Sequence, residues 1–200
     1  MQNFSSRFFI MRHGETDTNR KRIWQCSIDE PLNDTGRAQA REAANFVMNL
    51  RPDVIVSSDL SRARETAQIV ASYLDDVEMR VEPGLRERSC GEAEGLNTDG
   101  IQKKFGFRME MTSSLLDNVP GAEAYEHFAQ RILETFNRIY DETGTSRVLA
   151  VCHGGVMRTF YNEQINPVPL GIVFHNCAII TTARENGRWS IVDRYKTDKI

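Results

Sequence analysis

A short apolar run near the start of the chain constrains the fold more than any other feature. Phe8–Met11 is bulky and unbroken, as expected of a central strand that is covered on both faces. Arg12 and His13 follow at its carboxyl end, which is where open α/β sheets place their ligands. An imidazole beside a guanidinium suits nucleophilic chemistry on phosphate, whereas a lone histidine at a strand end is more often structural.

Two later segments repeat this arrangement of a short apolar strand that ends in polar residues. They are Val54–Val56 with Ser57-Ser58, and Val148–Cys152 with His153-Gly154-Gly155. Strands and helical segments alternate along the first part of the chain, which predicts a mainly parallel sheet with right-handed crossovers and helices on both faces. We therefore expect a three-layer α/β sandwich in which the strands that end at Met11, Val56 and Cys152 are neighbours.

Helical spacing of apolar residues marks three long helices. The first is capped by Asn33 and ends before Pro52, the second follows Ser58, and the third covers Ala122–Thr143. Their apolar positions include Ala40, Ala43, Ala44, Val47 and Leu50 in the first, Leu60, Ala63, Ala67, Val70 and Leu74 in the second, and Tyr125, Phe128, Ile132, Phe136 and Ile139 in the third.

The remaining elements are shorter. A further strand is predicted at Met79–Glu82. Asn186-Gly187 is a strong hairpin signal between residues 178–183 and 189–193, which predicts antiparallel strands at one edge of the sheet. Periodicity weakens between residues 91 and 120, where we expect an insertion or cap with a short helix near 101–105 and a Met-rich stretch that contains Met109 and Met111.

Length and charge exclude several classes of protein. A chain of 200 residues is expected to form a single domain over residues 1–200, with the cap at about 91–120. The net charge is −3 and basic residues are scattered, so neither a nucleic acid nor an anionic membrane is an expected partner. The first residues lack an apolar targeting segment, and no apolar run approaches the ~20 residues that span a bilayer. A soluble protein is expected, with its oligomeric state left open.

The cysteines favour a reducing compartment. Cys26, Cys90, Cys152 and Cys177 have no short Cys-x-x-Cys spacing, which argues against a structural zinc site. We expect four reduced thiols, no bound metal or cofactor, and a cytoplasmic location.

Taken together, several blocks of the sequence resemble the histidine phosphatase superfamily, and more narrowly its phosphoglycerate mutase-like branch. The blocks occur in order from Phe8 to about Tyr195. They are Arg12-His13-Gly14-Glu15-Thr16 with Asn19, Ser57-Ser58-Asp59-Leu60-Ser61-Arg62-Ala63 with Thr66-Ala67, Glu87 with Gly91 and Glu94-Gly95, and His153-Gly154-Gly155.

The resemblance implies a phosphatase that hydrolyses small phosphomonoesters in two steps without a metal. His13 would attack the phosphate to form a phosphohistidine, which water then hydrolyses. Arg12, Arg62 and His153 would stabilise charge on the phosphoryl oxygens, with hydrogen bonds from Asn19 and the Gly154 backbone. Glu87 would protonate the leaving oxygen and then activate water.

The rim of the expected site departs from the family. Cys26, Cys90 and Ala93 replace a glycine, an aromatic residue and a tryptophan that are common in relatives, and Ala122 and Ala124 replace a second glycine and a serine. These changes indicate an altered entrance. Gln25 and Arg88 are candidates for contact with the non-phosphate part of the substrate, and a solvated side chain is the alternative for each.

Three functions fit this pattern. A phosphatase acting on a small phosphorylated metabolite, or on a phosphoprotein, is favoured because all five principal catalytic positions are intact. A phosphoglycerate mutase is the first alternative, although the chain is short for one. A non-catalytic module that binds phosphorylated ligands is the second.

Overall fold

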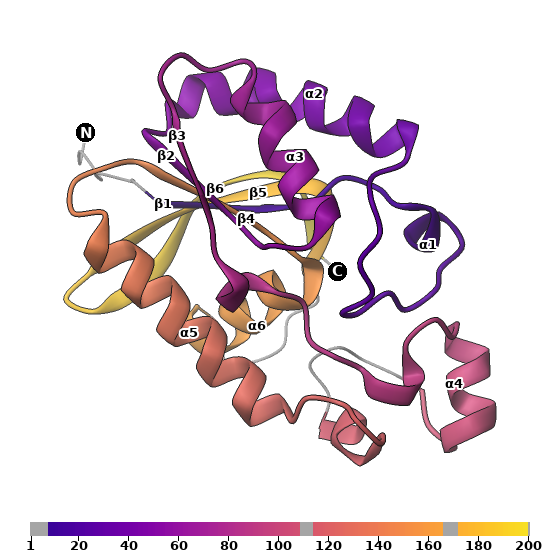
Figure 1. The fold of residues 1–200 in the computed structure, drawn as a ribbon. Helices are drawn as coiled ribbons and strands as arrows, with labels where there is room; N and C mark the ends of the chain where they lie inside the picture. The colour runs from indigo at the N-terminus through magenta and orange to yellow at the C-terminus, as the bar shows by residue number, and fades with distance from the viewer. Residues whose placement is uncertain (1–7, 109–113, 166–171, 200) are drawn as a thin grey trace.

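The computed structural model describes residues 8–108, 114–165 and 172–199, which build a six-stranded sheet with helices on both faces (Figure 1). The strands are β1 (Phe8–Arg12), β2 (Val54–Ser57), β3 (Glu78–Val81), β4 (Val148–Cys152), β5 (Ile172–Glu185) and β6 (Arg188–Lys199). Their order across the sheet is β3-β2-β4-β1-β5-β6. β1 to β4 run parallel, and β5 pairs antiparallel with both β1 and β6. The predicted three-layer α/β sandwich with an antiparallel edge is confirmed.

The three strands that precede the polar blocks are neighbours, as expected. β1 pairs with β4 so that Arg12 lies opposite Cys152, and β2 pairs with β4 so that Ser57 lies opposite Val151. Because the strands are parallel and in register, the residues that follow them emerge at the same edge of the sheet. This edge is the carboxyl edge, where α/β folds bind ligands.

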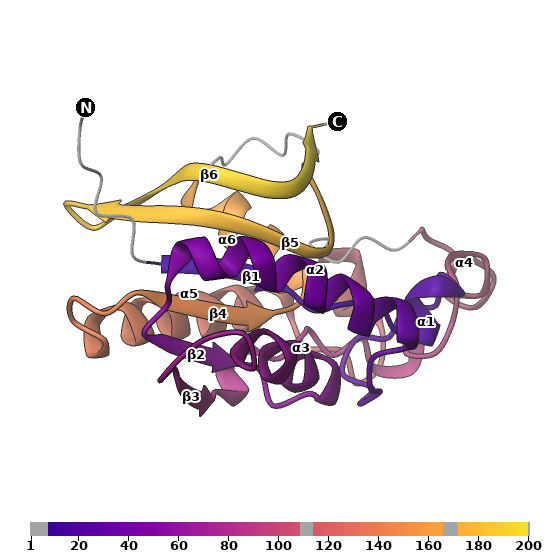
Figure 2. The ribbon, with the colours of Figure 1, turned by 90° about the horizontal axis from the view of Figure 1, so that it is seen from above.

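Helices cover both faces of the sheet and divide the core in two (Figures 1 and 2). α2 (Asp34–Leu50) and α3 (Ser61–Ala71) pack on one face, where small residues such as Ala43 and Ala67 allow close contact with the strands. α5 (Tyr125–Glu142) and α6 (Gly154–Gln164) cover the other face with larger side chains. α6 directly follows the polar block after β4 and was not predicted.

Two segments lie beyond the carboxyl edge of the sheet. The first, residues 17–30, contains α1 (Asp17–Arg20), and the second, residues 88–107, contains α4 (Thr98–Phe105); both views place α1 and α4 at the same end of the molecule. We call these two segments the rim. Short 3-10 helices at Pro83–Leu85, Gly91–Ala93 and Ser114–Asn118 complete this region, and a separate small hydrophobic cluster joins the two segments.

The remaining predictions differ from the structure mainly in length. The predicted third strand is shifted by one residue, and the helix near 101–105 begins three residues earlier, at Thr98. The hairpin at Asn186-Gly187 is present, but β5 and β6 are much longer than expected. Met109 and Met111 lie outside the described residues. Among the residues that the structure describes, no helix is long and apolar enough to span a membrane.

A register shift in β5 matters for the site. The pairing of β5 with β6 is interrupted between Phe174 and Ile179, a β-bulge that lies beside the end of β1. Within it, the backbone N–H of Cys177 and the side-chain amide of Asn176 both donate to the carbonyl of His13, at 3.2 and 3.1 Å. The antiparallel edge therefore also contributes to the position of His13.

Candidate active site

His13 lies directly after β1, and its backbone is fixed on both sides. Its N–H donates to the Cys152 carbonyl at 3.0 Å, which extends the β1–β4 ladder by one residue. The next residue, Gly14, donates its N–H to Thr66 Oγ1 at 3.0 Å. A Cβ at Gly14 would lie 2.5 Å from the Gly36 carbonyl oxygen, so only glycine permits this loop to pack against the start of α2.

The ring of His13 is held in one tautomer. Its Nδ1 lies 2.6 Å from the Gly14 carbonyl oxygen, and because a carbonyl can only accept, Nδ1 carries the proton. Burial, followed by the charges of Arg62 and Arg12, holds the pKa of His13 well below its usual range. The ring is therefore neutral near pH 7, and Nε2 has a free lone pair. These are the properties of a nucleophile.

Arg12 presents an unused donor beside this ring. Its Nη1 donates to the Phe174 carbonyl at 2.7 Å, whereas its buried Nε has no hydrogen-bond partner among the described residues. A Cβ on Gly154 would lie 3.3 Å from this Nε. Gly154 thus leaves room next to a buried cationic donor, and an unpaired group of this kind indicates a site for an anion.

Arg62, in the first turn of α3, is almost fully buried and makes three hydrogen bonds. Nη2 donates to the Cys26 carbonyl and Nη1 to the Ile28 carbonyl, both at 2.7 Å, and Nε donates to His153 Nδ1 at 3.2 Å. A guanidinium has five N–H groups, so two remain for a ligand. Burial lowers the pKa of Arg62 to about 10, and the group stays cationic at neutral pH.

His153 lies behind Arg62 and does not line the cavity. Because Arg62 Nε can only donate, Nδ1 of His153 accepts, and its Nε2–H donates to Ser58 Oγ at 2.9 Å. Burial, followed by Arg62, lowers the pKa of His153 well below its usual range, so this ring is also neutral. The rings of His13 and His153 are 5.2 Å apart at their centroids. In this arrangement His153 orients Arg62.

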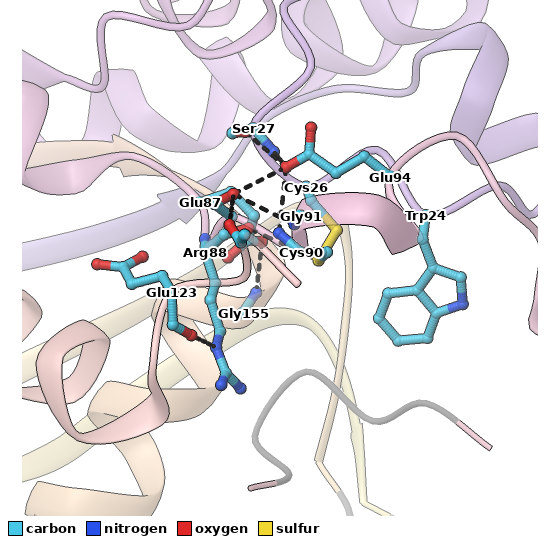
Figure 3. The surroundings of a disulfide bond; sticks show 12 residues. Trp24, Cys26, Ser27, Glu87, Arg88, Cys90, Gly91, Glu94, Glu123 and Gly155 are labelled. Carbon is cyan, nitrogen blue, oxygen red and sulfur yellow. Dashed lines mark hydrogen bonds between the residues drawn. A yellow bond between two sulfur atoms is a disulfide. The ribbon is translucent and has the colours of Figure 1, made fainter. Parts of the chain in front are cut away.

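Glu87 faces the same cavity from the segment after β3. Its Oε2 accepts the Gly155 N–H at 2.8 Å, and its Oε1 accepts the Arg88 N–H at 3.0 Å (Figure 3). Burial raises the pKa of Glu87, and it outweighs these two N–H groups together with the charges of Arg62 and Arg12. A carboxyl with a raised pKa can exchange a proton nearer to neutral pH than an exposed one.

Asn19 and Gln25 both line the cavity, as expected from the resemblance. Asn19 Oδ1 accepts hydrogen bonds from the Thr16 backbone N–H and from the Asn176 side-chain amide. The NH₂ group of Asn19 therefore points away from Thr16 and Asn176. Gln25 is more constrained, because its amide donates to Glu30 at 2.8 Å and its oxygen accepts from Thr16. Asn19 therefore retains both donors for a ligand.

Arg88 does not reach the cavity. Its guanidinium is buried on the opposite side, where Nε donates to the Glu123 carbonyl at 2.9 Å and Nη2 pairs with Asp117 (Figure 3). The structure thus gives Arg88 a place in the packing between the segment after Glu87 and the start of α5. Its neighbour in sequence, Glu87, points the other way.

The prediction of four reduced cysteines is wrong for two of them. Cys26 and Cys90 form a disulfide bond across the rim, although 64 positions separate them, and Cys152 and Cys177 are free and buried. The prediction failed because spacing in the sequence does not reveal that the two segments meet. Among the described residues, no group of three or more His, Cys, Asp or Glu side chains is arranged to hold a metal ion.

The cavity at this edge has a volume of about 610 Å³, within the range of small-molecule sites. Seven of the nine predicted site residues line it, six by their side chains and Gly154 by its backbone, together with side chains that sequence reasoning missed. The predicted ones are Arg12, His13, Asn19, Gln25, Arg62, Glu87 and Gly154, and the missed ones include Arg22, Trp24, Thr98, Arg158, Phe174 and Asn176. The missed residues carry no motif, and only the fold brings them together.

Comparison with known proteins agrees with this geometry. The family model described as histidine phosphatase superfamily (branch 1) matches residues 8–197. The chain belongs to the histidine phosphatase superfamily. The resemblance inferred from its sequence blocks is thereby confirmed.

Relatives within this superfamily are named as phosphatases. The uncharacterised phosphatase PhoE of Bacillus subtilis is 34% identical over 77% of this chain and 75% of that protein. A metal-independent phosphoserine phosphatase of Arabidopsis thaliana is 34% identical over 76% of this chain and 66% of that protein. The structure of a mycobacterial glucosyl-3-phosphoglycerate phosphatase is 25% identical, with a TM-score of 0.77 over 93% of this chain and 97% of that chain. The family and the names of these relatives identify this histidine phosphatase as a phosphomonoester hydrolase.

Proposed function

We propose that this histidine phosphatase hydrolyses small phosphomonoesters through a phosphohistidine on His13. The observation that carries the proposal is the state of the His13 ring, which is neutral, has its proton on Nδ1 and keeps Nε2 free beside two buried arginines. A non-catalytic binding module would need the cationic groups but not a nucleophile held in one tautomer. We also infer that residues 1–200 act as one domain, with residues 91–120 as its cap.

The first step is an in-line attack of His13 Nε2 on phosphorus. The phosphoryl oxygens lie against Arg12 Nε and the two free N–H groups of Arg62, which stabilise the charge that is spread over them. Asn19 supplies a further donor. Glu87 in its protonated form, which the raised pKa favours, transfers its proton to the leaving oxygen.

The second step reverses the roles of these groups. The carboxylate left on Glu87 accepts a proton from water, which attacks the phosphohistidine and releases inorganic phosphate. His153 holds Arg62 through both steps, since its Nδ1 accepts from Arg62 Nε. The neutral His13 ring and the proton on Glu87 are restored for the next cycle.

The substrate is a metabolite that carries a second anionic group. Arg22 and Arg158 line the cavity in addition to Arg12 and Arg62, and among the described residues neither has a side-chain partner. The cavity thus has four positively charged arginines and one carboxyl, that of Glu87. The positive charge that remains is greater than a single phosphate dianion can neutralise. Arg22 also has a backbone φ of 55°, a conformation unusual for a side chain other than glycine, and strained backbone of this kind clusters at functional sites.

No metal is needed in this scheme, because arginines supply the positive charge that Mg²⁺ supplies in other phosphoryl transfers. One relative is named a metal-independent phosphoserine phosphatase. The test is a panel of phosphorylated metabolites and p-nitrophenyl phosphate, assayed with EDTA. We expect turnover to be unaffected by the chelator. Activity that disappears with EDTA and returns with added metal would reject the proposal.

A phosphoglycerate mutase is the second candidate, because some relatives carry that name. Arg88 is turned away from the cavity, which leaves Arg22 and Arg158 as the charged groups available for the rest of a substrate. Incubation with 3-phosphoglycerate separates the two functions. A phosphatase releases inorganic phosphate, whereas a mutase converts the substrate to its 2-phospho isomer without release.

Vanadate provides an independent test of the anion site. The glucosyl-3-phosphoglycerate phosphatase structure described above is a complex with VO3. We expect vanadate to inhibit this protein competitively and to bind between Arg12, Arg62 and His13. Crystals soaked in vanadate that show the ion elsewhere, with this cavity empty, would contradict the assignment.

A further inference from the structure

The disulfide between Cys26 and Cys90 joins the two halves of the rim next to the active site. Cys26 lines the cavity, and Cys90 follows Glu87 by three residues in the sequence (Figure 3). Their Cα atoms are 5.7 Å apart and both side chains are buried. A single covalent bond therefore connects the segment that contacts Arg62 with the segment that carries Glu87.

The Cys26 end of the disulfide contacts the catalytic machinery directly. The carbonyl of Cys26 accepts from Arg62 Nη2 at 2.7 Å, and it is one of two carbonyls that orient this guanidinium. Cys26 has a backbone φ of 48°, which lies in the left-handed region that side chains other than glycine rarely adopt. The crosslink is thus attached to a strained peptide whose carbonyl orients Arg62.

The two halves of the rim are also held together by bonds that do not involve sulfur. Trp24 N–H donates to the Leu96 carbonyl and Gly95 N–H to the Trp24 carbonyl, both at 2.9 Å. Glu94 Oε1 accepts from Ser27 Oγ at 2.6 Å and from the Cys90 N–H at 3.1 Å. None of these contacts needs the sulfur–sulfur bond, so we expect them to persist after reduction. The rim then stays closed, and the change is confined to the surroundings of Cys26.

The two other cysteines are poor partners for thiol exchange. Cys152 and Cys177 are buried, and burial raises the pKa of Cys152 well above its usual range and that of Cys177 to about 12. A thiol that does not ionise is a weak nucleophile toward disulfides. A redox response of the described residues is therefore expected from Cys26 and Cys90.

We propose that Cys26 and Cys90 form a reversible thiol–disulfide site that controls how tightly the active site binds the phosphoryl group. In the oxidised form the crosslink holds the Cys26 carbonyl against Arg62. In the reduced form the strained peptide at Cys26 relaxes and Arg62 loses one of the carbonyls that orient it. The inference rests on the proposed function, because it takes Arg62 to be a ligand of the phosphoryl oxygens.

The redox step is an ordinary exchange with a dithiol. A thiolate of the reductant attacks one sulfur of the disulfide and forms a mixed disulfide, and its second thiol then displaces the remaining cysteine. Two electrons and two protons pass to Cys26 and Cys90, and the dithiol becomes a disulfide. In the reverse direction, glutathione disulfide takes up the two electrons and two protons and becomes two molecules of glutathione.

Binding and redox state are then linked in both directions. If the oxidised protein binds phosphate more tightly by some factor, bound phosphate must make the disulfide harder to reduce by the same factor. A crosslink that only stabilises the fold has no such relation to the ligand. This reciprocity separates control of the site from a structural role.

The experiment measures the binding of inorganic phosphate by calorimetry to the full chain, first oxidised with glutathione disulfide and then reduced with dithiothreitol. We expect Kd to rise about tenfold on reduction, as for the loss of one charged hydrogen bond. The kcat/KM on p-nitrophenyl phosphate should fall by a similar factor and recover on reoxidation. Saturating phosphate should increase the ratio of reduced to oxidised dithiothreitol that is needed for half-reduction.

Two variants control for other effects. The double variant Cys26→Ala with Cys90→Ala should bind phosphate like the reduced protein under both conditions. The double variant Cys152→Ala with Cys177→Ala should keep the full response to reduction. If a cysteine variant does not fold, reversible reduction of the unaltered chain still provides the test.

Three results would overturn the proposal. Equal Kd values for the two redox states, even with a lower melting temperature for the reduced one, would show that the crosslink is structural only. Mass spectrometry that finds free thiols at Cys26 and Cys90 after treatment with glutathione disulfide would show that the bond does not form. Absence of phosphate binding and of turnover in both states would reject the proposed function together with this inference.

Discussion

The carboxyl edge of the sheet and the rim above it hold their residues in different ways. At the edge, His13 continues the β1–β4 ladder and Arg62 lies in the first turn of α3, so regular backbone structure positions both. In the rim, α1 has four residues and other contacts are made by irregular backbone, a disulfide and the Glu94 carboxylate. Regular structure thus holds the proposed nucleophile and Arg62, whereas irregular backbone holds most of the groups around the cavity entrance.

Because the sheet edge and the rim are held in different ways, we expect most rim residues to tolerate substitution without a change at the sheet edge. Sheet register fixes the distance between the nucleophile and its anion site, and a change there affects every substrate. In the proposed mechanism the rim acts on the phosphoryl group through Asn19 and, by way of the Cys26 carbonyl, through Arg62. Its other side chains should be exchangeable without loss of the phosphoryl transfer itself. Variants of the two regions should therefore affect different kinetic constants.

The largest effect is expected at His13. His13→Ala removes the atom that bonds to phosphorus, and turnover of all phosphomonoesters should fall by roughly 10⁴-fold or more. Acid-quench labelling with a ³²P-labelled substrate should detect a phosphoenzyme in the unaltered chain and none in the variant. His127→Ala, on the exposed side of α5, is the matched control and should have normal activity.

A smaller loss that depends on the leaving group is expected at Glu87. Glu87→Gln removes the proton donor and should lower kcat for alkyl phosphates by ~10²–10⁴-fold. The loss on p-nitrophenyl phosphate should be much smaller, because that leaving group departs without a proton. Equal losses on both substrates would mean that Glu87 positions the site and does not donate the proton. Glu92→Gln, at an exposed position, should change neither rate.

The pH profile follows from the same two groups. Activity requires neutral His13, so its lowered pKa places the acidic limit of kcat/KM well below pH 6.5. Activity also requires protonated Glu87, so its raised pKa moves the alkaline limit above pH 4.5. Activity should rise with pH through the pKa of His13 and fall with pH through that of Glu87. In Glu87→Gln the alkaline limit should disappear.

Substitution of two cavity arginines, Arg22 in the rim and Arg158 in α6, should affect substrate binding selectively. Arg158→Ala or Arg22→Ala should raise KM about tenfold for phosphomonoesters that carry a second anionic group, since each removes one charged contact. The KM for p-nitrophenyl phosphate, which lacks that group, should change less than about twofold. Equal effects on both substrates would mean that these arginines contact the transferred phosphoryl group and not the second anionic group.

The smallest effect on activity is expected at Arg88. Its guanidinium is satisfied by Asp117 and the Glu123 carbonyl, away from the cavity. Arg88→Met should leave KM and kcat within about twofold, while the melting temperature falls because Asp117 loses its buried partner. Thermal unfolding and steady-state kinetics on the same preparation check this. A large increase in KM with an unchanged melting temperature would indicate that Arg88 contacts the substrate.

The two regions also differ in how well the sequence predicts them. The strand ends at Met11, Val56 and Cys152 were predictable because buried parallel strands are unbroken apolar runs. Their register brings His13 next to His153, which in turn contacts Ser58. Helix α6 was missed, since Gly154 and Gly155 read as a loop and not as the start of a helix. The lengths of β5 and β6 were underestimated because polar residues alternate along an exposed edge.

In the rim, each contact joins segments that are far apart in the sequence. Cys26 meets Cys90, and Arg88 meets Asp117, through loops whose paths no local pattern determines. Trp24 in the rim and Arg158 in α6 both line the cavity for the same reason. Motifs revealed Arg12, His13, Arg62 and Glu87, but the other side chains that line the cavity became visible only in three dimensions.

The hydrogen bond from His13 Nδ1 to the Gly14 carbonyl has a stereochemical consequence. With that nitrogen occupied, the phosphoryl group must arrive at and depart from the same Nε2. Each displacement inverts the configuration at phosphorus, and two successive inversions give net retention. A phosphoryl group made chiral with oxygen isotopes and passed to an alcohol acceptor in place of water should therefore keep its handedness.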